Sequence, residues 1–468
     1  MSGGSYELYL DAIPGERRAA LVGPDGRLES LRIDRDGRPR AAEAIFRARV
    51  VRIDKQTGAA FLDLGPAGEA MLPKAGGLTE GAAVTVQATR EAFGGKGAGV
   101  TRGWSLSERY LSWTAGRKGI QWSPALGQGK RRADLEEALE RSLAAAPDRA
   151  GLRDGLSVRA QALGADGDAL AGDLTRLAQR RTAILAAEGA AKPPAALEPA
   201  LDFAQAAVRD APAQARVATD DRALHQRLKS LTAETWPDLA EGLAFSDPAR
   251  GALFDEAGIA DSLEQALARR VPLPGGGRIT IDRTEAMVVI DVDSGGSADG
   301  GGKKEEALFR LNKRALEEAA RQIRLRNLSG LIVIDCVTLR GKGRMKALVE
   351  SLRARVRSDP VKTDVLGFTA AGLIEATRQR FGPSLDEVMN APAASPAPAP
   401  DAQAAAILRA ALRLRGAGRP VAWASEAVER AFAGPLAAAK AEVDRRLGRP
   451  LEIRRGEDRT PPVVEMER

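Results

Sequence analysis

The sequence predicts a multidomain protein of the α+β class. Its 468 residues exceed what one hydrophobic core supports, so we expect roughly three or more modules. Residues 44–103 hold short runs of alternating apolar and polar residues, which are typical of a small antiparallel barrel. Residues 286–334 hold two apolar runs on either side of a long helical pattern, which is typical of a βαβ unit.

The remaining elements of the first half follow from the same periodicities. The alternating runs of the barrel segment are Phe46–Ile53 and Ala59–Leu64, with Gly and polar residues between them. A Pro/Gly break at 272–277 marks a domain boundary. Between the barrel and this break we predict, in order, a helix at Ala133–Ala146, a strand at Gly155–Arg159, a helix at Leu170–Leu185 and a mainly helical segment at 200–270.

The βαβ segment carries the clearest α/β pattern of the chain. Its apolar runs are Ala286–Ile290 and Leu331–Ile334. A strand, a crossover helix and a second strand produce parallel neighbours in one sheet, so both strands should end at the same edge. The helical pattern between the runs places five apolar residues on one face: Leu308, Leu311, Ala315, Ala319 and Ile323.

The last part of the chain differs in composition. Residues 391–402 are rich in Ala and Pro, which predicts an extended linker. Residues 403–468 have helical and strand-like runs and should form a small separate domain.

Composition limits the chemistry that the protein can perform. The net charge of +7 fits a polyanionic partner, although only weakly. Because Cys336 is the single cysteine and His225 the single histidine, an internal disulfide and a multi-cysteine zinc site are excluded, and a histidine-based triad nearly so. The sequence has no basic and apolar leader and no run of about 18 apolar residues, which predicts a cytoplasmic protein without a membrane span.

Two aspartates follow the two apolar runs at matching positions. Asp291 comes directly after the first run and Asp335 directly after the second. The carboxyl edge of parallel strands is where open α/β sheets bind ligands, and neighbouring strands lie only about 4.8 Å apart. Two carboxylates that close repel each other unless a cation lies between them, and oxygen ligands suit Mg²⁺, with Mn²⁺ as an alternative. With Asp293 as a third carboxylate nearby, the pattern predicts metal-assisted cleavage of a phosphodiester.

Simpler explanations exist for these residues. One aspartate could cap the helix while the other ends a strand in solvent, but the matched positions favour a metal site. Lys303 and Lys304, after the Gly-rich loop 295–302, could meet phosphates or could lie in solvent. The glycine pattern of that loop is neither a dinucleotide-binding nor a P-loop fingerprint.

Four ordered sequence blocks resemble the core of the ribonuclease E/G family. They are Gly276–Ala286, Ile290–Ser294, Leu325–Asp335 and Gly372–Arg380. The resemblance implies that Asp291 and Asp335 hold the catalytic Mg²⁺. Where the family commonly has Asn two residues beyond the first aspartate, this chain has Asp293, a candidate catalytic residue that adds charge and would alter the binding of the metal.

The resemblance also implies an order of domains. An RNase H-like scaffold at residues 1–43 plus 200–268 is interrupted by an OB-fold RNA-binding domain at 44–103 and a 5′-sensor-like domain at 104–199. A magnesium-binding catalytic domain, related in fold to deoxyribonuclease I, follows at 269–390. The Ala/Pro linker and the small domain complete the chain.

The resemblance implies RNA contacts outside the metal site. In the family an aromatic pair and a lysine of the OB-fold hold single-stranded RNA by stacking and charge. Phe61 matches the first aromatic residue and Lys96 the lysine, whereas Met71 stands at the second aromatic position. Phe61 could equally be part of the barrel core. The family's Arg-Thr pair that senses a 5′-monophosphate corresponds to Arg159 and Ala160, so 5′-end sensing should be weaker or differently built.

Two further departures from the family lie near the metal domain. Ala370 stands where a basic residue usually precedes the Gly-Leu block, which removes one phosphate contact. The family's Cys-x-x-Cys pair, which binds a zinc shared between subunits, is replaced by the Ala/Pro linker. Because Cys336 lies elsewhere, no zinc link is expected, and any oligomer must form through another interface.

These observations predict a magnesium-dependent endoribonuclease that acts on single-stranded RNA in RNA decay or in the maturation of ribosomal or transfer RNA. The alternative is a catalytically quiet RNA-binding protein on the same scaffold, suggested by Met71, Ala160, Ala370 and the missing zinc ligands. Retention of both metal aspartates argues against that alternative. A metal-dependent phosphatase or an unrelated α/β enzyme fits poorly with the OB-like segment and the basic charge.

Overall fold

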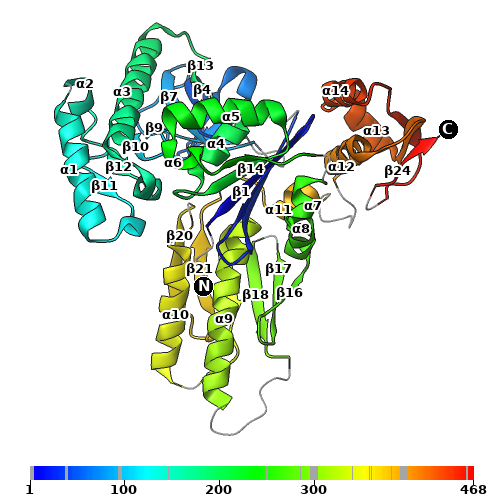
Figure 1. Ribbon diagram of the computed structural model, residues 1–468. Coiled ribbons are helices and arrows are strands. Elements are labelled where there is room, and N and C mark those ends of the chain that lie inside the picture. Colours follow the sequence, from blue (N-terminus) through cyan, green and yellow to red (C-terminus); the bar gives the residue numbers. More distant parts are fainter. Residues whose placement is uncertain are drawn as a thin grey trace. The chain divides into compact units, whose positions relative to one another are not determined.

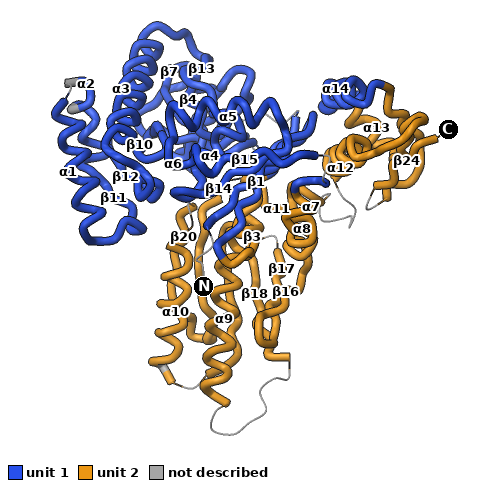
Figure 2. Tube along the Cα trace, viewed as in Figure 1, with its two compact units in different colours: residues 1–24, 33–253, 433–448 blue, residues 25–32, 254–432, 449–468 orange. Residues whose placement is uncertain are grey.

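The fold is a mixture of helices and sheets (Figure 1). A computed structural model describes residues 5–36, 41–92, 97–145, 147–248, 251–284, 286–295, 304–339, 341–357, 359, 361–380, 382–390, 399–459 and 462–467. The chain forms two compact units (Figure 2): unit 1 is 1–24, 33–253 and 433–448, and unit 2 is 25–32, 254–432 and 449–468. The α+β prediction is therefore confirmed. None of the described helices has the length and hydropathy needed to cross a membrane.

The first sheet joins strands that are far apart in the sequence. Strand β1 (Glu7–Ile13) is antiparallel to β2 (Glu16–Val22) and parallel to β14 (Arg216–Thr219), and β3 (Leu28–Arg35) and β15 (Leu243–Phe245) are the outer strands. The sequence between β3 and β14 is thus an insertion into this sheet. Helix α4 (Phe203–Asp210) ends the insertion, and α5 (Arg222–Thr235) and α6 (Pro237–Ala240) follow β14.

A closed barrel forms the first part of the insertion. Its neighbouring strands, in order, are β4 (Ile45–Ile53), β5 (Ala60–Asp63), β6 (Glu69–Leu72), β8 (Ala98–Thr101) and β7 (Ala83–Arg90). Strand β7 pairs back with β4, which closes the barrel, and β13 (Ala195–Glu198) adds to β4 from outside. Alternate residues point inward and are buried, among them Val50, Leu62 and Val86. The predicted OB-like barrel is confirmed, but it is not wholly antiparallel, because β6 and β8 pair in parallel.

The second part of the insertion is a small sheet with helices. The sheet order is β11-β12-β10-β9. Helix α3 begins where the Asp166 side chain accepts a hydrogen bond from the Ala169 N–H at 2.8 Å. The elements are β9 (Ser105–Ser107), β10 (Leu111–Thr114), β11 (Gln121–Trp122), α1 (Lys130–Ala144), α2 (Pro147–Ala150), β12 (Leu156–Val158) and α3 (Gly167–Ala190).

The main sheet of unit 2 has six strands in the order β16-β17-β18-β19-β21-β20. Its central pair, β18 (Met287–Asp293) and β19 (Gly330–Asp335), is parallel, which confirms the predicted βαβ unit. Helices α9 (Lys304–Leu325) and α10 (Lys342–Val356) lie side by side, and their apolar residues share one core with the sheet (Figure 1). The other strands are β16 (Arg270–Pro272), β17 (Arg278–Arg283), β20 (Thr363–Phe368) and β21 (Ile374–Arg378).

The predicted linker overlaps a helix. Residues 391–398 lie outside the described part of the chain, but 400–402 form the first turn of α12 (Pro400–Arg413). The extended linker is therefore wrong at its end, because Pro400 occupies a first-turn position where a missing N–H is tolerated. The elements not yet given are α7 (Leu253–Glu256), α8 (Ile259–Leu267), α11 (Leu385–Met389), β22 (Arg419–Ala424), α13 (Glu426–Ala433), α14 (Ala437–Leu447), β23 (Glu452–Arg455) and β24 (Val464–Glu467).

Candidate functional site

The two predicted metal aspartates are direct neighbours in the main sheet of unit 2. Asp291 of β18 and Asp335 of β19 are register partners across the parallel pair. Alternation along β18 sends Val288, Ile290 and Val292 into the core that α9 and α10 share, and Asp291 to the opposite face. Both aspartates are exposed, so the fold presents two carboxylates side by side on two central strands of the sheet.

The two aspartates do not both follow their strands as expected. Asp335 is the last residue of β19, but Asp291 lies inside β18, which continues to Asp293. The strand is longer because β17 pairs with it further along, with Thr280 opposite Asp291 and Arg278 opposite Asp293. The extra pairing fixes the backbone on one side of Asp291.

The surroundings of the pair fit a divalent cation. Among the described residues, neither Asp291 nor Asp335 has a hydrogen-bond or ion-pair partner. Two unneutralised carboxylates on adjacent strands about 4.8 Å apart repel each other, and a cation with oxygen ligands removes that repulsion. In the described ranges no three His, Cys, Asp or Glu side chains gather as a metal cage. A pair of carboxylates suits Mg²⁺, which keeps several waters and is commonly bound by one or two carboxylates.

The third predicted carboxylate, Asp293, is engaged with its neighbours. It forms an ion pair with Arg278, its register partner, and accepts a hydrogen bond from the Gly295 N–H at 2.8 Å. The Gly295 N–H and the Arg278 charge lower the pKa of Asp293 below its usual value. Asp293 is therefore on the same face as Asp291, with its charge already balanced by Arg278.

A buried amide near the end of β19 was not predicted. Asn312 of α9 is fully buried, donates to the Val337 carbonyl at 2.7 Å and accepts from the Val337 N–H at 3.0 Å. Val337 lies two residues beyond Asp335, so Asn312 fixes the backbone that leaves β19. The available signal was a polar residue beside Leu311, on the apolar face of the predicted helix.

Cys336, next to Asp335, lies in the core of the main sheet of unit 2. Its side chain is buried, and burial together with the Asp335 charge raises the pKa of the thiol to about 12. Cys336 therefore belongs to the core of the sheet, whereas the neighbouring Asp335 is exposed.

The predicted RNA-contact residues of the barrel are only partly described. Phe61 is a half-buried residue of β5 with Met71 of β6 as its register partner, whereas Lys96 lies outside the described residues. Arg52, which was not predicted, places its guanidinium carbon 4.0 Å from the centre of the Phe61 ring. Its only sequence signal is an arginine at an alternate position of β4.

The predicted sensor residue Arg159 is held by protein groups. It follows β12, hydrogen-bonds the Glu108 carbonyl and pairs with the Asp210 carboxylate at 2.8 Å. Ala160 begins a 3-10 turn and offers no hydroxyl. Ala370 is exposed in the turn between β20 and β21. Arg159 belongs to unit 1 with Phe61, whereas Asp291 and Asp335 belong to unit 2.

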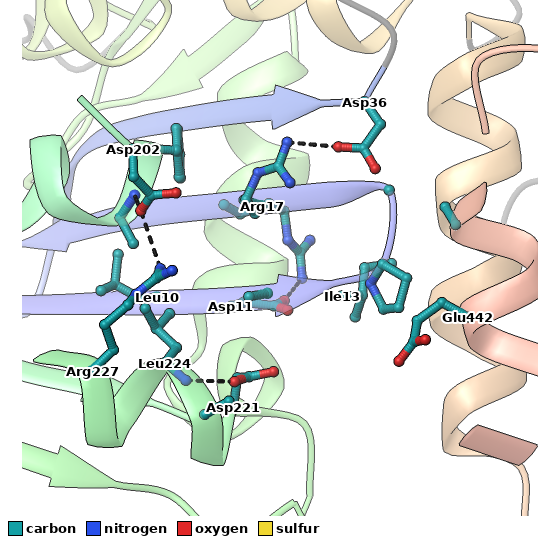
Figure 3. Close-up of a pocket in the computed structure, with 18 of the residues that line it drawn as sticks. Leu10, Asp11, Ile13, Arg17, Asp36, Asp202, Asp221, Leu224, Arg227 and Glu442 are labelled. Atoms are coloured by element: carbon teal, nitrogen blue, oxygen red, sulfur yellow. Dashed lines mark hydrogen bonds and ion pairs between the residues drawn. The ribbon is translucent and has the colours of Figure 1, made fainter. Parts of the chain in front are cut away.

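A cavity of about 500 Å³ in unit 1 contains none of these residues (Figure 3). Charged residues that line the cavity pair with one another: Arg17 pairs with Asp36 at 2.8 Å and Arg227 with Asp202 at 3.2 Å. Asp221 accepts from the Leu224 N–H at 2.7 Å. The cavity offers no concentration of one charge, in contrast to the aspartate pair.

Known proteins resemble most of this chain. Residues 105–381 match the model of the ribonuclease E/G family. The chain is 29% identical to Ribonuclease G of Escherichia coli (strain K12) over 408 residues, which are 82% of this chain and 81% of that protein. Ribonuclease G of Haemophilus influenzae is also 29% identical, over 82% of each chain.

A longer relative covers the same part of this chain. Ribonuclease E of Escherichia coli (strain K12) is 32% identical over 396 residues, which are 80% of this chain and 36% of that protein. The family model spans more than half of the 468 residues and contains both strands that carry Asp291 and Asp335. The chain belongs to the ribonuclease E/G family.

Proposed function

We propose that this protein is a magnesium-dependent endoribonuclease that hydrolyses phosphodiester bonds of single-stranded RNA during RNA processing or decay. The observation that carries the proposal is the register pairing of Asp291 with Asp335, two exposed and unneutralised carboxylates on parallel strands. The family and the names of the relatives, Ribonuclease G and Ribonuclease E, support RNA as the substrate.

The fold assignments of the individual domains belong to the same proposal. The mixed six-stranded sheet under α9 and α10 is the deoxyribonuclease-I-like catalytic domain of residues 269–390. The sheet of β1, β2, β3, β14 and β15 is the RNase H-like scaffold. Support comes from the insertion of the barrel and the small sheet between β3 and β14.

The residues at and around the aspartate pair have different roles in the proposed site. Asp291 and Asp335 hold the cation, while Asn312 fixes the backbone beyond Asp335 through Val337. Asp293 stays with Arg278 and so limits the negative charge at the site. When bound, Mg²⁺, or Mn²⁺ in its place, would bind a phosphate oxygen and lower the pKa of a water molecule that attacks phosphorus.

A catalytically quiet RNA-binding protein is the second candidate. Its support is the state of Arg159, whose guanidinium is already used by Asp210 and the Glu108 carbonyl, together with Met71 in place of an aromatic residue. This candidate leaves the pairing of two exposed aspartates without a role.

Cleavage of a fluorescent single-stranded RNA, with Mg²⁺, Mn²⁺ or EDTA, separates the two candidates. We expect metal-dependent cutting that Asp291→Asn and Asp335→Asn each slow at least about a hundredfold, with RNA binding retained. Asp282→Asn is the matched control, because Asp282 lies on neighbouring β17 and pairs with Arg269 at 2.6 Å. RNA binding without cutting under every divalent ion would favour the quiet protein.

A further inference from the structure

A row of side chains crosses the outer face of the barrel. Arg52 of β4, Phe61 of β5, Met71 of β6 and Gly99 of β8 are successive register partners on neighbouring strands. Arg52 is exposed, and Phe61 and Met71 are half-buried. Arg90 of β7 completes the row: it lies across Gly99, where an added Cβ would come within 2.7 Å of the Arg90 Nε. The Arg52–Arg90 row therefore has two apolar residues between two arginines.

Arg52 lies over an aromatic ring, and the only charge shown to act with it is that of Asp54, whose pKa it helps to lower without forming an ion pair among the described residues. Its guanidinium carbon lies over the Phe61 ring at 4.0 Å from the ring centre, which is the distance of direct stacking. Within the described part of the chain it forms no hydrogen bond and no ion pair. The guanidinium lies over one face of the ring, and Arg52 is exposed, so its side chain is accessible to a ligand from solvent.

We infer that Arg52, held against Phe61, is the stacking surface on which this barrel receives a base of single-stranded RNA. This inference rests on the proposed function. Because Arg52 covers one face of the Phe61 ring, a base cannot stack directly on that face. Met71, which stands where the family has an aromatic residue, has no flat surface. A guanidinium is planar, so a base can stack on it, and its N–H groups can donate to the adjacent phosphate. Arg52 thereby supplies stacking and charge from one side chain.

The charge-retaining substitution Arg52→Lys tests stacking directly. Binding of a short fluorescent single-stranded RNA is measured by anisotropy in EDTA, so that no cleavage occurs. We expect Arg52→Lys to weaken binding about tenfold without changing the salt dependence, because the charge remains and the planar surface is lost. Arg49→Lys is the matched control: Arg49 is exposed on the same strand, donates to the Pro193 carbonyl at 2.7 Å and lies off the row. It should bind RNA as the wild type does.

An abasic strand of the same length provides the second measurement. Stacking needs bases, so wild type and Arg52→Lys should bind the abasic strand equally well. If Arg52→Lys binds ordinary RNA like wild type, or loses the same factor on both strands, the inference is overturned. If Arg52→Lys binds ordinary RNA like wild type, RNA binding by Phe61→Leu is measured next. Weakened binding by Phe61→Leu would leave the barrel as the RNA-binding domain, whereas unchanged binding would overturn that part of the proposed function as well.

Discussion

Asp291 and Asp335 stand opposite each other in the register of two parallel strands. Helix α9 connects those strands, so the helix that brings β19 back beside β18 also sets the spacing of the two carboxylates. The same helix supplies Asn312, which binds the backbone of Val337. The geometry of the proposed metal centre thus depends on α9 as much as on the strands.

Replacing Asn312 should damage the metal centre more than its effect on stability explains. Asn312→Leu removes both bonds to Val337, and we expect kcat and the affinity for metal to fall about tenfold to a hundredfold while KM for RNA stays unchanged. Leu311→Ala is the control, because Leu311 is a buried neighbour that does not bond to Val337. Equal loss of activity in both variants, at equal thermal stability, would mean that Asn312 acts only through the fold.

Replacing Arg109 should destabilise unit 1 strongly. Arg109 is fully buried, donates to both carboxylate oxygens of Asp238 at 2.8 and 2.7 Å, and bonds the carbonyls of Val208 and Ala211 at 3.0 and 2.9 Å. Arg109→Met removes the counter-charge of the buried Asp238 carboxylate, which keeps only the Tyr110 hydroxyl and the Gln214 N–H, and takes a donor from several carbonyls, which costs about 3–5 kcal/mol. Urea unfolding measures this. Arg153→Met, at an exposed pair with Glu140, should leave the urea midpoint unchanged.

The stability of unit 1 should depend on pH through the carboxyl group of Asp173. Burial and the neighbouring Glu108 charge raise the pKa of this carboxyl to about 6 from 3.8. Because the pKa of Asp173 is higher in the folded than in the unfolded protein, the protonated carboxyl stabilises the fold. This stabilisation is fully present below pH 3.8 and is lost as pH rises through about 6. Wild type should therefore become less stable relative to Asp173→Asn as pH rises between these values. The difference in free energy of unfolding between the two proteins should stay constant above pH 7. A flat difference would contradict the raised pKa.

Cleavage should depend little on the 5′ end of the RNA. Because Arg159 is occupied by Asp210 and the Glu108 carbonyl, RNAs with a 5′-monophosphate and a 5′-hydroxyl should be cut at rates within about threefold, or roughly 0.7 kcal/mol. Asp210→Asn should increase the preference for the monophosphate, since it removes the competing carboxylate. Strong preference by the wild type would show that Arg159 exchanges its partners for phosphate.

Local sequence patterns predicted the helices and strands that are determined by residues close to one another in the sequence. The apolar runs before Asp291 and Asp335, with the apolar face of α9, were enough to predict a parallel pair and two adjacent carboxylates. The alternating runs after residue 44 predicted the barrel for the same reason. Helical and strand periodicities depend on near neighbours in the sequence, so they can be read without the fold.

Contacts between distant residues could not be predicted in this way. The Asn312–Val337 bonds join residues 25 apart, and the Arg109–Asp238 pair joins residues 129 apart. The stacking of Arg52 on Phe61 depends on a strand register that shifts between Val50 and Arg52. The start of α12 at Pro400 was missed because the Ala/Pro composition of 391–402 suits both an extended linker and a first helical turn.

Binding of Mn²⁺, measured by electron paramagnetic resonance without RNA, tests the metal assignment most directly. Wild-type protein should bind Mn²⁺ and release it to excess Mg²⁺. Asp291→Asn and Asp335→Asn should each weaken binding about tenfold or more, the double variant should lose it, and Asp282→Asn should bind like wild type. Unchanged Mn²⁺ binding in the double variant would contradict the assignment of the metal to Asp291 and Asp335.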